Sequence, residues 1–495
     1  MGSLPALGLS CISGLILAGA FPSIKLGYFA FAGLLPLFTI LRNYTTGKVL
    51  LWTWVSGLVF HGITLFWMRN ITWAGMLIAI PILAFFFALP FAVSRIIYEV
   101  SPRLGFVVLP FAVAGIEWIR SFDKLAFPWM ILGNSQSSYP FFVQFADITS
   151  VYGVSAWIVM VNISLYLLVR KKTPGRWLLL TALFVLPTTY SLFVIHRDHS
   201  NGEELKVALV QGNVLPEEKW KNNLEFWNVK LYCTMSIEAM AHQPDIIVWP
   251  ETATPVYLLQ TPHFRHMVQS LVDSIGVPVL TGMPSSDSKT EESWNSAGFF
   301  VPGQYDVMEY KKIHLVPFGE AIPLDNYFPS LRKINLGQAN WDEGSEPVVF
   351  TSAYLPPFCA VICFESIFPD LVRRFVKKGV EFLVVITNDV WFGPGTSPEQ
   401  HAMIAVFRAI EFHRPLIRCA NTGISMIIDP FGRILKQTGT FKRETLIGSI
   451  TPTTQKTFYL RFGNVFSVMS ILFTTGCLIG CIIVRKKKVS EKESK

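Results

Sequence analysis

Long apolar runs separated by short basic segments fill the first 196 residues, and a different pattern follows them. Seven such runs precede Arg197, and an eighth lies near the carboxyl end. A helix needs about 20 mostly apolar residues to cross a bilayer, so we predict eight membrane-spanning helices. The predicted spans are Leu4–Pro22, Leu26–Leu41, Val49–Met68, Trp73–Ile97, Leu104–Ile119, Val151–Val169, Trp177–Ile195 and Val465–Val484.

Between about residue 204 and residue 451, short β-rich runs alternate with amphipathic stretches. The predicted strands are Val207–Gln211, Ile246–Trp249, Val277–Thr281, Ala297–Val301, Cys359–Cys363 and Phe382–Ile386. The predicted helices are Glu217–Met240, Phe264–Ile275, Pro369–Lys378 and Pro398–Phe412. This alternation predicts a layered α/β domain. The expected organisation is a membrane domain over 1–196, an α/β domain over 204–451, a final span over 463–485 and a basic tail over 486–495.

Composition supports a membrane protein with one water-soluble part. Hydrophobic residues make up 51% of the 495 residues, charged residues make up 15%, and the mean hydropathy is +0.42. Soluble globular proteins carry about 25% charged residues, and no acidic residue precedes Glu99 here. Seven scattered cysteines do not form a disulfide framework. These features exclude a soluble enzyme, a disordered chain and a disulfide-rich small domain.

The basic residues predict the orientation of the chain in the membrane. They follow the second, fourth, sixth and eighth predicted spans, and they are Arg42, Lys48, Arg103, Arg170, Lys171, Lys172, Arg176 and Arg485–Lys488. Loops rich in Lys and Arg stay in the cytoplasm. We therefore expect a multi-pass membrane protein with both termini in the cytoplasm and the α/β domain facing outward, which is the periplasm if the membrane is a bacterial inner membrane. The net charge of +8 does not predict nucleic-acid binding, because these residues form no single patch.

Three chemically reactive side chains each follow a predicted strand or lie in a conspicuous polar motif. Glu251 ends the run Ile246–Glu251, Lys312 lies in Tyr310–Glu320, and Cys363 ends its strand. A carboxylate can accept a thiol proton, and an ammonium can stabilise charge on a carbonyl oxygen that a sulfur attacks. The residues alone leave other roles open: a core cysteine, a solvated lysine and a helix-capping glutamate.

The motifs around these residues resemble those of a known family. Trp249-Pro-Glu-Thr, the Lys312 motif and Ile362-Cys-Phe-Glu365 resemble the three catalytic motifs of the nitrilase superfamily. Together with the predicted spans, they resemble its membrane branch, the bacterial apolipoprotein N-acyltransferases. Further matches are Val210–Asn213, Trp294–Ala297, Thr387–Gly393, Gln400-His401, Arg408–Glu411, Asn421–Gly423, Glu117–Arg120, Phe127–Trp129 and Tyr152–Ser155.

The resemblance implies an αββα sandwich joined to about eight transmembrane helices. It implies acyl transfer from a phospholipid to the N-terminal S-diacylglyceryl cysteine of an apolipoprotein, with no cofactor or metal. Cys363 would be the nucleophile, Glu251 the general base and Lys312 the oxyanion stabiliser. Supporting residues would be Glu320, Glu365, Asn295 and Trp220. Phe364 departs from the Tyr of many members.

Three functions are weighed on these grounds. The first is a membrane acyltransferase that works through a Cys363 thioester, with Tyr327–Leu331 as a candidate lid. The second is a membrane-tethered amidase, and the third is a transporter or lipid-binding scaffold. Few ionisable groups in the spans argue against an ion path. His314, His401 and His413 lack the tight spacing of a metal site, so structural roles are expected.

Overall fold

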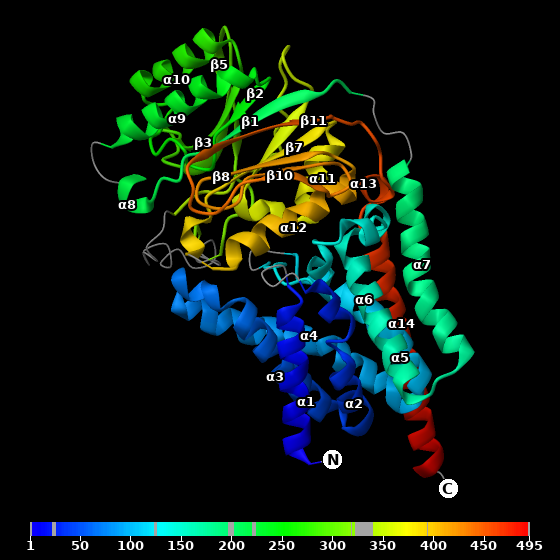
Figure 1. The fold of residues 1–495 in the computed structure, drawn as a ribbon. Helices are drawn as coiled ribbons and strands as arrows, with labels where there is room; N and C mark the ends of the chain where they lie inside the picture. The colour runs from blue at the N-terminus through cyan, green and yellow to red at the C-terminus, as the bar shows by residue number, and fades with distance from the viewer. Residues whose placement is uncertain are drawn as a thin grey trace. The chain divides into compact units, whose positions relative to one another are not determined.

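The computed structural model describes residues 2–21, 26–122, 126–196, 202–219, 224–317, 319–321, 340–393 and 395–493. The chain folds into two compact units. The helical unit comprises Met1–Arg69, Trp73–Arg197 and Phe462–Lys495. The second unit comprises Asn70–Thr72 and Asp198–Arg461, and it contains the sheets (Figure 1).

The helical unit is built from long apolar helices and a few 3-10 turns. The helices are α1 (Ser3–Gly19), α2 (Leu35–Asn43), α3 (Thr46–Thr64), α4 (Trp73–Val100), α5 (Pro102–Ile119), α6 (Ala146–Arg170), α7 (Pro174–His196) and α14 (Val465–Glu493). The 3-10 turns are η1 (Gly27–Phe31), η2 (Phe66–Asn70), η3 (Leu132–Gln136) and η4 (Pro140–Val143). Within the described residues, α4, α5, α6, α7 and α14 are long and apolar enough to cross a membrane. The prediction of a polytopic helical domain is thus confirmed.

The second predicted span, Leu26–Leu41, is wrong as a continuous helix. The chain forms η1 there and then the nine-residue α2, which at 1.5 Å per residue spans only about 14 Å. Gly33 lies at the break, where a Cβ would come within 2.5 Å of the Leu17 side chain. Asn162 of α6 accepts from Leu34 N at 2.9 Å and donates to Ala30 O at 2.7 Å. The interruption is therefore tolerated, because a buried side chain satisfies the freed backbone groups.

Helices α6 and α7 differ in how deeply they are packed. In the most apolar stretch of α6, 83% of the residues are buried, whereas in that of α7 only 11% are buried. Only Ser191 and Val194 are buried among the residues of α7. Helix α6 is therefore a central element of the helical unit, and most of α7 exposes apolar side chains. Helix α14 continues to Glu493, so the predicted basic tail is helical through that residue.

The second unit contains two mixed sheets. One has the order β11-β1-β2-β3-β4-β5 and the other β10-β9-β8-β7-β6. Strands β1, β2 and β3 are parallel, as are β6, β7 and β8, and the outer pairs are antiparallel. The strands are β1 (Leu205–Gln211), β2 (Ile246–Val248), β3 (Val279–Ser286), β4 (Ser293–Val301), β5 (Gln304–Lys311), β6 (Phe358–Ile362), β7 (Phe382–Thr387), β8 (Leu416–Ala420), β9 (Met426–Ile428), β10 (Ile434–Gln437) and β11 (Glu444–Ile450).

The two sheets face each other between two layers of helices. Phe299 of β4 meets Phe358 of β6 edge to face at 5.0 Å, and the Cys419 thiol of β8 donates to Val248 O of β2 at 3.2 Å. Helices α9 (Glu225–Ala239) and α10 (Pro262–Ile275) cover the first sheet, and α11 (Pro369–Lys377) and α12 (Ser397–Phe412) cover the second (Figure 1). The predicted αββα sandwich is confirmed.

Several predicted elements differ in their bounds. The helix predicted over Glu217–Met240 is two helices, α8 (Pro216–Lys219) and α9, with residues 220–223 outside the described residues. The strand predicted from Val277 begins at Val279, after Pro278, which has no N–H to donate to a ladder. Strand β6 ends at Ile362, so Cys363 lies beyond the strand in the 3-10 turn η7 (Cys363–Ile367).

Candidate active site

The ends of three strands bring Glu251, Lys312 and Cys363 into one buried cluster. Glu251 follows β2, Lys312 directly follows β5, and Cys363 directly follows β6. Their exposed fractions are 5%, 1% and 8%. Lys312 Nζ lies 3.4 Å from Glu251 Oε1, and the charges of both groups act on the Cys363 thiol. Glu251 and Cys363 follow strands of different sheets, β2 and β6. They come close together because the two sheets face each other.

Cys363 occupies an unusual backbone conformation. Its φ is +52°, a left-handed value that is uncommon for a residue other than glycine. The carbonyl of Cys363 accepts a hydrogen bond from Ser366 Oγ at 2.8 Å, and it lies 3.1 Å from His401 Nε2. Such conformations cost about 1–3 kcal/mol and persist where the surroundings hold them. The turn thus fixes the position of the thiol at the end of β6.

Lys312 lies between two carboxylates. Its Nζ donates to Glu320 Oε1 at 2.8 Å as well as to Glu251 Oε1. Asn295 Nδ2 donates to the same two oxygens, at 2.7 Å to Glu251 and 3.1 Å to Glu320. Asn388 N donates to the other Glu251 oxygen at 2.8 Å. Glu251 therefore keeps a fixed orientation while one of its oxygens faces the ammonium.

Glu365 connects the segment that carries Lys312 with the turn that carries Cys363. Its Oε1 accepts from Tyr310 Oη at 2.6 Å, from Ile313 N at 2.7 Å and from His314 N at 3.1 Å. Its Oε2 accepts from Ile362 N at 2.8 Å. Because these donors lie on both sides of Lys312 and directly before Cys363, the Glu365 carboxyl fixes the two segments relative to each other.

The electrostatics of the cluster favour a neutral thiol and a charged ammonium. Burial, and then the Glu251 carboxylate, raise the pKa of Cys363 well above its usual range, although Lys312 opposes them. Burial lowers the pKa of Lys312, but the carboxylates of Glu320 and Glu251 outweigh burial and raise that pKa overall. At rest the site therefore holds a protonated thiol beside a carboxylate and a cation.

A second buried cluster, formed by Asp389, His401 and Arg418, contacts the turn that carries Cys363. Asp389 accepts from Arg418 Nη2 at 2.8 Å and lies 2.9 Å from His401 Nδ1. Burial and then Arg418 lower the pKa of His401. Ligand-type atoms of Cys363, Asp389 and His401 lie within 4.8 Å of one another. Both nitrogens of His401 already face hydrogen-bonding partners, so the cluster is explained as a support of the Cys363 turn without a metal ion.

Lys219 is a site residue that sequence reasoning missed. It ends α8, its side chain is only 2% exposed, and its Nζ donates to Thr252 Oγ1 at 3.0 Å and to Glu251 O at 3.3 Å. Burial lowers its pKa to about 7, against the opposing charge of Glu251. The run Pro216-Glu-Glu-Lys219 is typical of a solvated helix start, so the sequence carries no sign of this burial.

The structure places six of the predicted site residues together. Six members of the predicted set lie within the cluster: Glu251, Lys312, Cys363, Glu320, Glu365 and Asn295. Trp220 and the candidate lid Tyr327–Leu331 lie outside the described residues. Phe364 packs edge to face on Phe368 at 5.1 Å. His314 stacks on the same Phe368 at 4.5 Å, and His413 Nδ1 lies 3.1 Å from Gln455 Oε1.

Comparisons with known proteins agree with these features. The carbon-nitrogen hydrolase family matches residues 206–459, and the apolipoprotein N-acyltransferase N-terminal domain matches residues 13–164. The apolipoprotein N-acyltransferase of Geobacter metallireducens is 30% identical, covering 97% of this chain and 96% of that protein. The apolipoprotein N-acyltransferase of Chlorobaculum tepidum is 31% identical, covering 91% and 92%. This chain belongs to the apolipoprotein N-acyltransferase family.

Membership in the apolipoprotein N-acyltransferase family makes the chain an acyltransferase and a bacterial membrane protein. Among solved structures, Saccharomyces cerevisiae Nit3, a member of branch 10 of the nitrilase superfamily, aligns at 20% identity with a TM-score of 0.39. That alignment covers 50% of this chain and 91% of that chain.

Proposed function

We propose that this protein moves an acyl chain from a membrane phospholipid to the α-amine of an S-diacylglyceryl cysteine at the start of an apolipoprotein. In this proposal Cys363 carries the acyl chain as a thioester, Glu251 is the general base, and Lys312 stabilises the oxyanion. The observation that carries the proposal is the buried contact between the Glu251 carboxylate and the Lys312 ammonium beside a neutral thiol, in a chain of this family.

The first half-reaction forms the thioester. Glu251 takes the Cys363 proton as the sulfur attacks the ester carbonyl of the phospholipid. Lys312 offsets the negative charge that develops on the carbonyl oxygen. When the tetrahedral intermediate collapses, the carbon–oxygen ester bond breaks. The lysophospholipid alkoxide leaves with the proton that Glu251 held, so the base is regenerated.

The second half-reaction forms the amide. The neutral α-amine of the acceptor attacks the thioester carbonyl, and Glu251 accepts the amine proton. Lys312 again faces the oxyanion, the carbon–sulfur bond breaks, and the Cys363 sulfur recovers a proton from Glu251. In this scheme Asn295 and Glu320 hold Glu251 and Lys312 in place through their hydrogen bonds, and Glu365 fixes the segment of Lys312 relative to the turn of Cys363. An amide is more stable than a thioester, so the scheme uses no ATP.

We also propose that this chemistry takes place on the periplasmic side, with both termini in the cytoplasm. Arg42, Arg103 and Arg170 lie near the ends of three different helices, α2, α5 and α6, yet they line one pocket of the helical unit. Arg485 pairs with Glu99 at 3.0 Å, and Glu99 lies four residues before Arg103 in the chain. These basic helix ends thus share one end of the helical unit, and such an end is expected in the cytoplasm.

A reaction with both substrates distinguishes acyl transfer from hydrolysis by an amidase. The purified full-length protein is mixed with a phospholipid and a peptide that begins with S-diacylglyceryl cysteine. Transfer predicts a lysophospholipid and an N-acylated peptide in equal amounts. An amidase would yield no N-acylated peptide, and that result would refute the proposal. A peptide whose α-amine is already acetylated is the matched control, and it should gain no acyl chain.

A further inference from the structure

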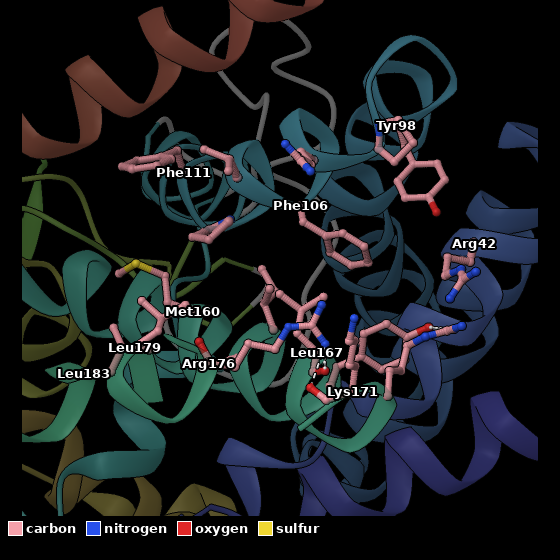
Figure 2. Close-up of a pocket in the computed structure, with 18 residues that line it drawn as sticks. Arg42, Tyr98, Phe106, Phe111, Met160, Leu167, Lys171, Arg176, Leu179 and Leu183 are labelled. Atoms are coloured by element: carbon pink, nitrogen blue, oxygen red, sulfur yellow. Dashed lines mark hydrogen bonds between the residues drawn. The ribbon is translucent and has the colours of Figure 1, made fainter. Parts of the chain in front are cut away.

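The helical unit contains an amphiphilic pocket of about 790 Å³ that the proposed acyl transfer does not use (Figure 2). It lies among α4, α5, α6 and α7 and the end of α2, and all eighteen residues that line it belong to the helical unit. Pockets of 300–1,000 Å³ are typical of small-molecule sites. The volume therefore suits an organic ligand rather than a single ion.

Apolar and aromatic side chains form one part of the pocket. Met160 in the middle of α6 and Leu179 and Leu183 of α7 lie at one end in Figure 2. Phe106 of α5 packs against Tyr98 of α4, with ring centroids 5.7 Å apart. Helix α7 is exposed over most of its length, so this apolar wall is open to the lipid that surrounds a membrane helix. A lipid acyl chain could pack against these apolar side chains.

Five cations lie around the other part of the pocket. Arg42 is the next-to-last residue of α2, Arg103 is the second residue of α5, and Arg170 ends α6. Lys171 lies in the following turn, and Arg176 lies in the first turn of α7. Figure 2 shows Arg42 and Lys171 at the end of the pocket opposite Leu183. No Asp or Glu is among the eighteen residues described as lining it.

Two of the five cations, Arg176 and Arg170, donate to neutral groups. Arg176 Nη1 donates to Leu167 O and to Lys171 O, the latter at 2.9 Å. Arg170 Nη1 donates to Tyr166 Oη at 3.3 Å. These acceptors are neutral, so they orient the guanidinium groups without cancelling their charge. Positive charges around one cavity repel one another, and a bound anion relieves that repulsion.

We propose that this pocket is a binding site for an anionic phospholipid, with the phosphate among Arg42, Arg103 and Lys171 and an acyl chain along α6 and α7. Basic pockets between membrane helices at the cytoplasmic end are suited to anionic head groups. A free phosphate would leave the apolar wall without a role, and a zwitterionic lipid would leave part of the charge uncompensated. The proposal does not depend on the identity of the acyl donor, because every lining residue lies outside the unit that carries Cys363.

The test compares lipids and paired variants of the full-length protein in detergent. Native mass spectrometry measures retention of phosphatidylglycerol and of phosphatidylcholine with the same acyl chains. The double variant Arg103→Gln, Lys171→Gln should bind phosphatidylglycerol about 25-fold more weakly, at about fivefold for each cation removed. The matched control is Lys48→Gln, Lys172→Gln. It removes the same charge from exposed positions that do not line the pocket, and it should bind like the parent protein.

A third variant tests occupation by the acyl chain. Val107 lines the pocket and is 52% exposed, so Val107→Trp narrows the apolar part without removing a cation. It should weaken phosphatidylglycerol binding at least tenfold, and glycerol phosphate should not compete with the lipid. Equal retention of the two lipids by the parent protein would overturn the proposal. So would equal losses in the two charge variants, unchanged binding by Val107→Trp, or displacement of the lipid by glycerol phosphate.

Discussion

The resting thiol of Cys363 is neutral, because burial and the Glu251 carboxylate both raise its pKa well above the usual range. A buried neutral thiol needs a base at the moment of attack, in contrast to cysteines that are held as thiolates by nearby cations. The Lys312 ammonium stays charged in the same place, since Glu320 and Glu251 outweigh its burial. The site thus separates two tasks: a carboxylate moves the proton, and a fixed cation meets the developing negative charge.

Replacing Lys312 by Met tests the oxyanion role. We expect kcat/KM to fall by about 10²–10³-fold, the usual cost of removing one oxyanion-stabilising group. Lys311 is the matched control. Its ammonium lies 3.1 Å from the centre of the Trp294 ring, away from the two carboxylates that bind Lys312. Lys311→Met should change kcat/KM less than threefold, and equal losses in both variants would contradict the assignment. Initial rates of acyl transfer provide the measurement.

Lys219 predicts a pH dependence of stability. Burial lowers its pKa in the folded protein to about 7, whereas an unfolded chain keeps this proton up to about pH 10.4. Between these values the unfolded state binds more protons, so stability rises with pH by up to about 1.4 kcal/mol per pH unit. The thermal midpoint of the wild type relative to Lys219→Met should therefore increase from pH 7 to pH 10. A difference that stays flat over this range would contradict the lowered pKa.

At the scale of elements, the sequence predicts a strand best where it contains one long continuous apolar run. The continuous apolar run Phe382–Ile386 predicts β7 almost to the residue, and all of β7 is buried. Strand β5, Gln304–Lys311, was not predicted because most of it is exposed or half-buried and its polar residues hide the pattern. The short segment at α2 was predicted as a span because composition does not reveal that Asn162 satisfies the backbone at the break.

The contacts that support the candidate site were harder to predict than its three central residues. Glu251, Lys312 and Cys363 lie in recognisable motifs. Asp389, His401 and Arg418 come from η8 (Asp389–Phe392), α12 and β8, and their contact depends on how these three elements pack. Sequence distance carries no information about such packing.

The buried pair Asp389–Arg418 predicts a large stability effect. Both side chains are fully buried, and removing one partner of a buried pair costs about 3–5 kcal/mol. Arg418→Met should therefore lower the free energy of unfolding by that amount. The matched control is Arg433→Met, because Arg433 pairs with Asp429 through a side chain that is 58% exposed, and such pairs contribute about 0–1 kcal/mol. Chemical denaturation of the purified protein measures the difference, and similar effects of the two variants would contradict the account.

At the scale of the whole molecule, composition already predicts one part that lies in the membrane and one part that lies in water. The lack of acidic residues before Glu99 indicates the membrane, and the strand-rich pattern after residue 204 indicates water. The described structure divides into a helical unit and a sheet-containing unit. The side of the membrane on which the second unit lies follows from charge and not from packing, so it needs its own experiment.

Cysteine labelling tests the proposed orientation. Lys172 lies in the basic segment between α6 and α7, and Lys289 lies in an exposed turn between β3 and β4. A membrane-impermeant thiol reagent added to cells with a permeabilised outer membrane should label Lys289→Cys at least tenfold more than Lys172→Cys. Opening the inner membrane should make the two signals equal. Preferential labelling of Lys172→Cys in intact cells would place the second unit in the cytoplasm and contradict the proposal.

The central claim is that the Cys363 sulfur carries the acyl chain between donor and acceptor. Its most direct test is mass spectrometry of the full-length protein after incubation with phospholipid and no acceptor. We predict an added acyl mass in the wild type and in Cys359→Ala, which removes the neighbouring buried cysteine of β6, and no such mass in Cys363→Ala. Addition of the diacylated peptide should remove the acyl mass from the protein. An acyl adduct that persists in Cys363→Ala would contradict the account.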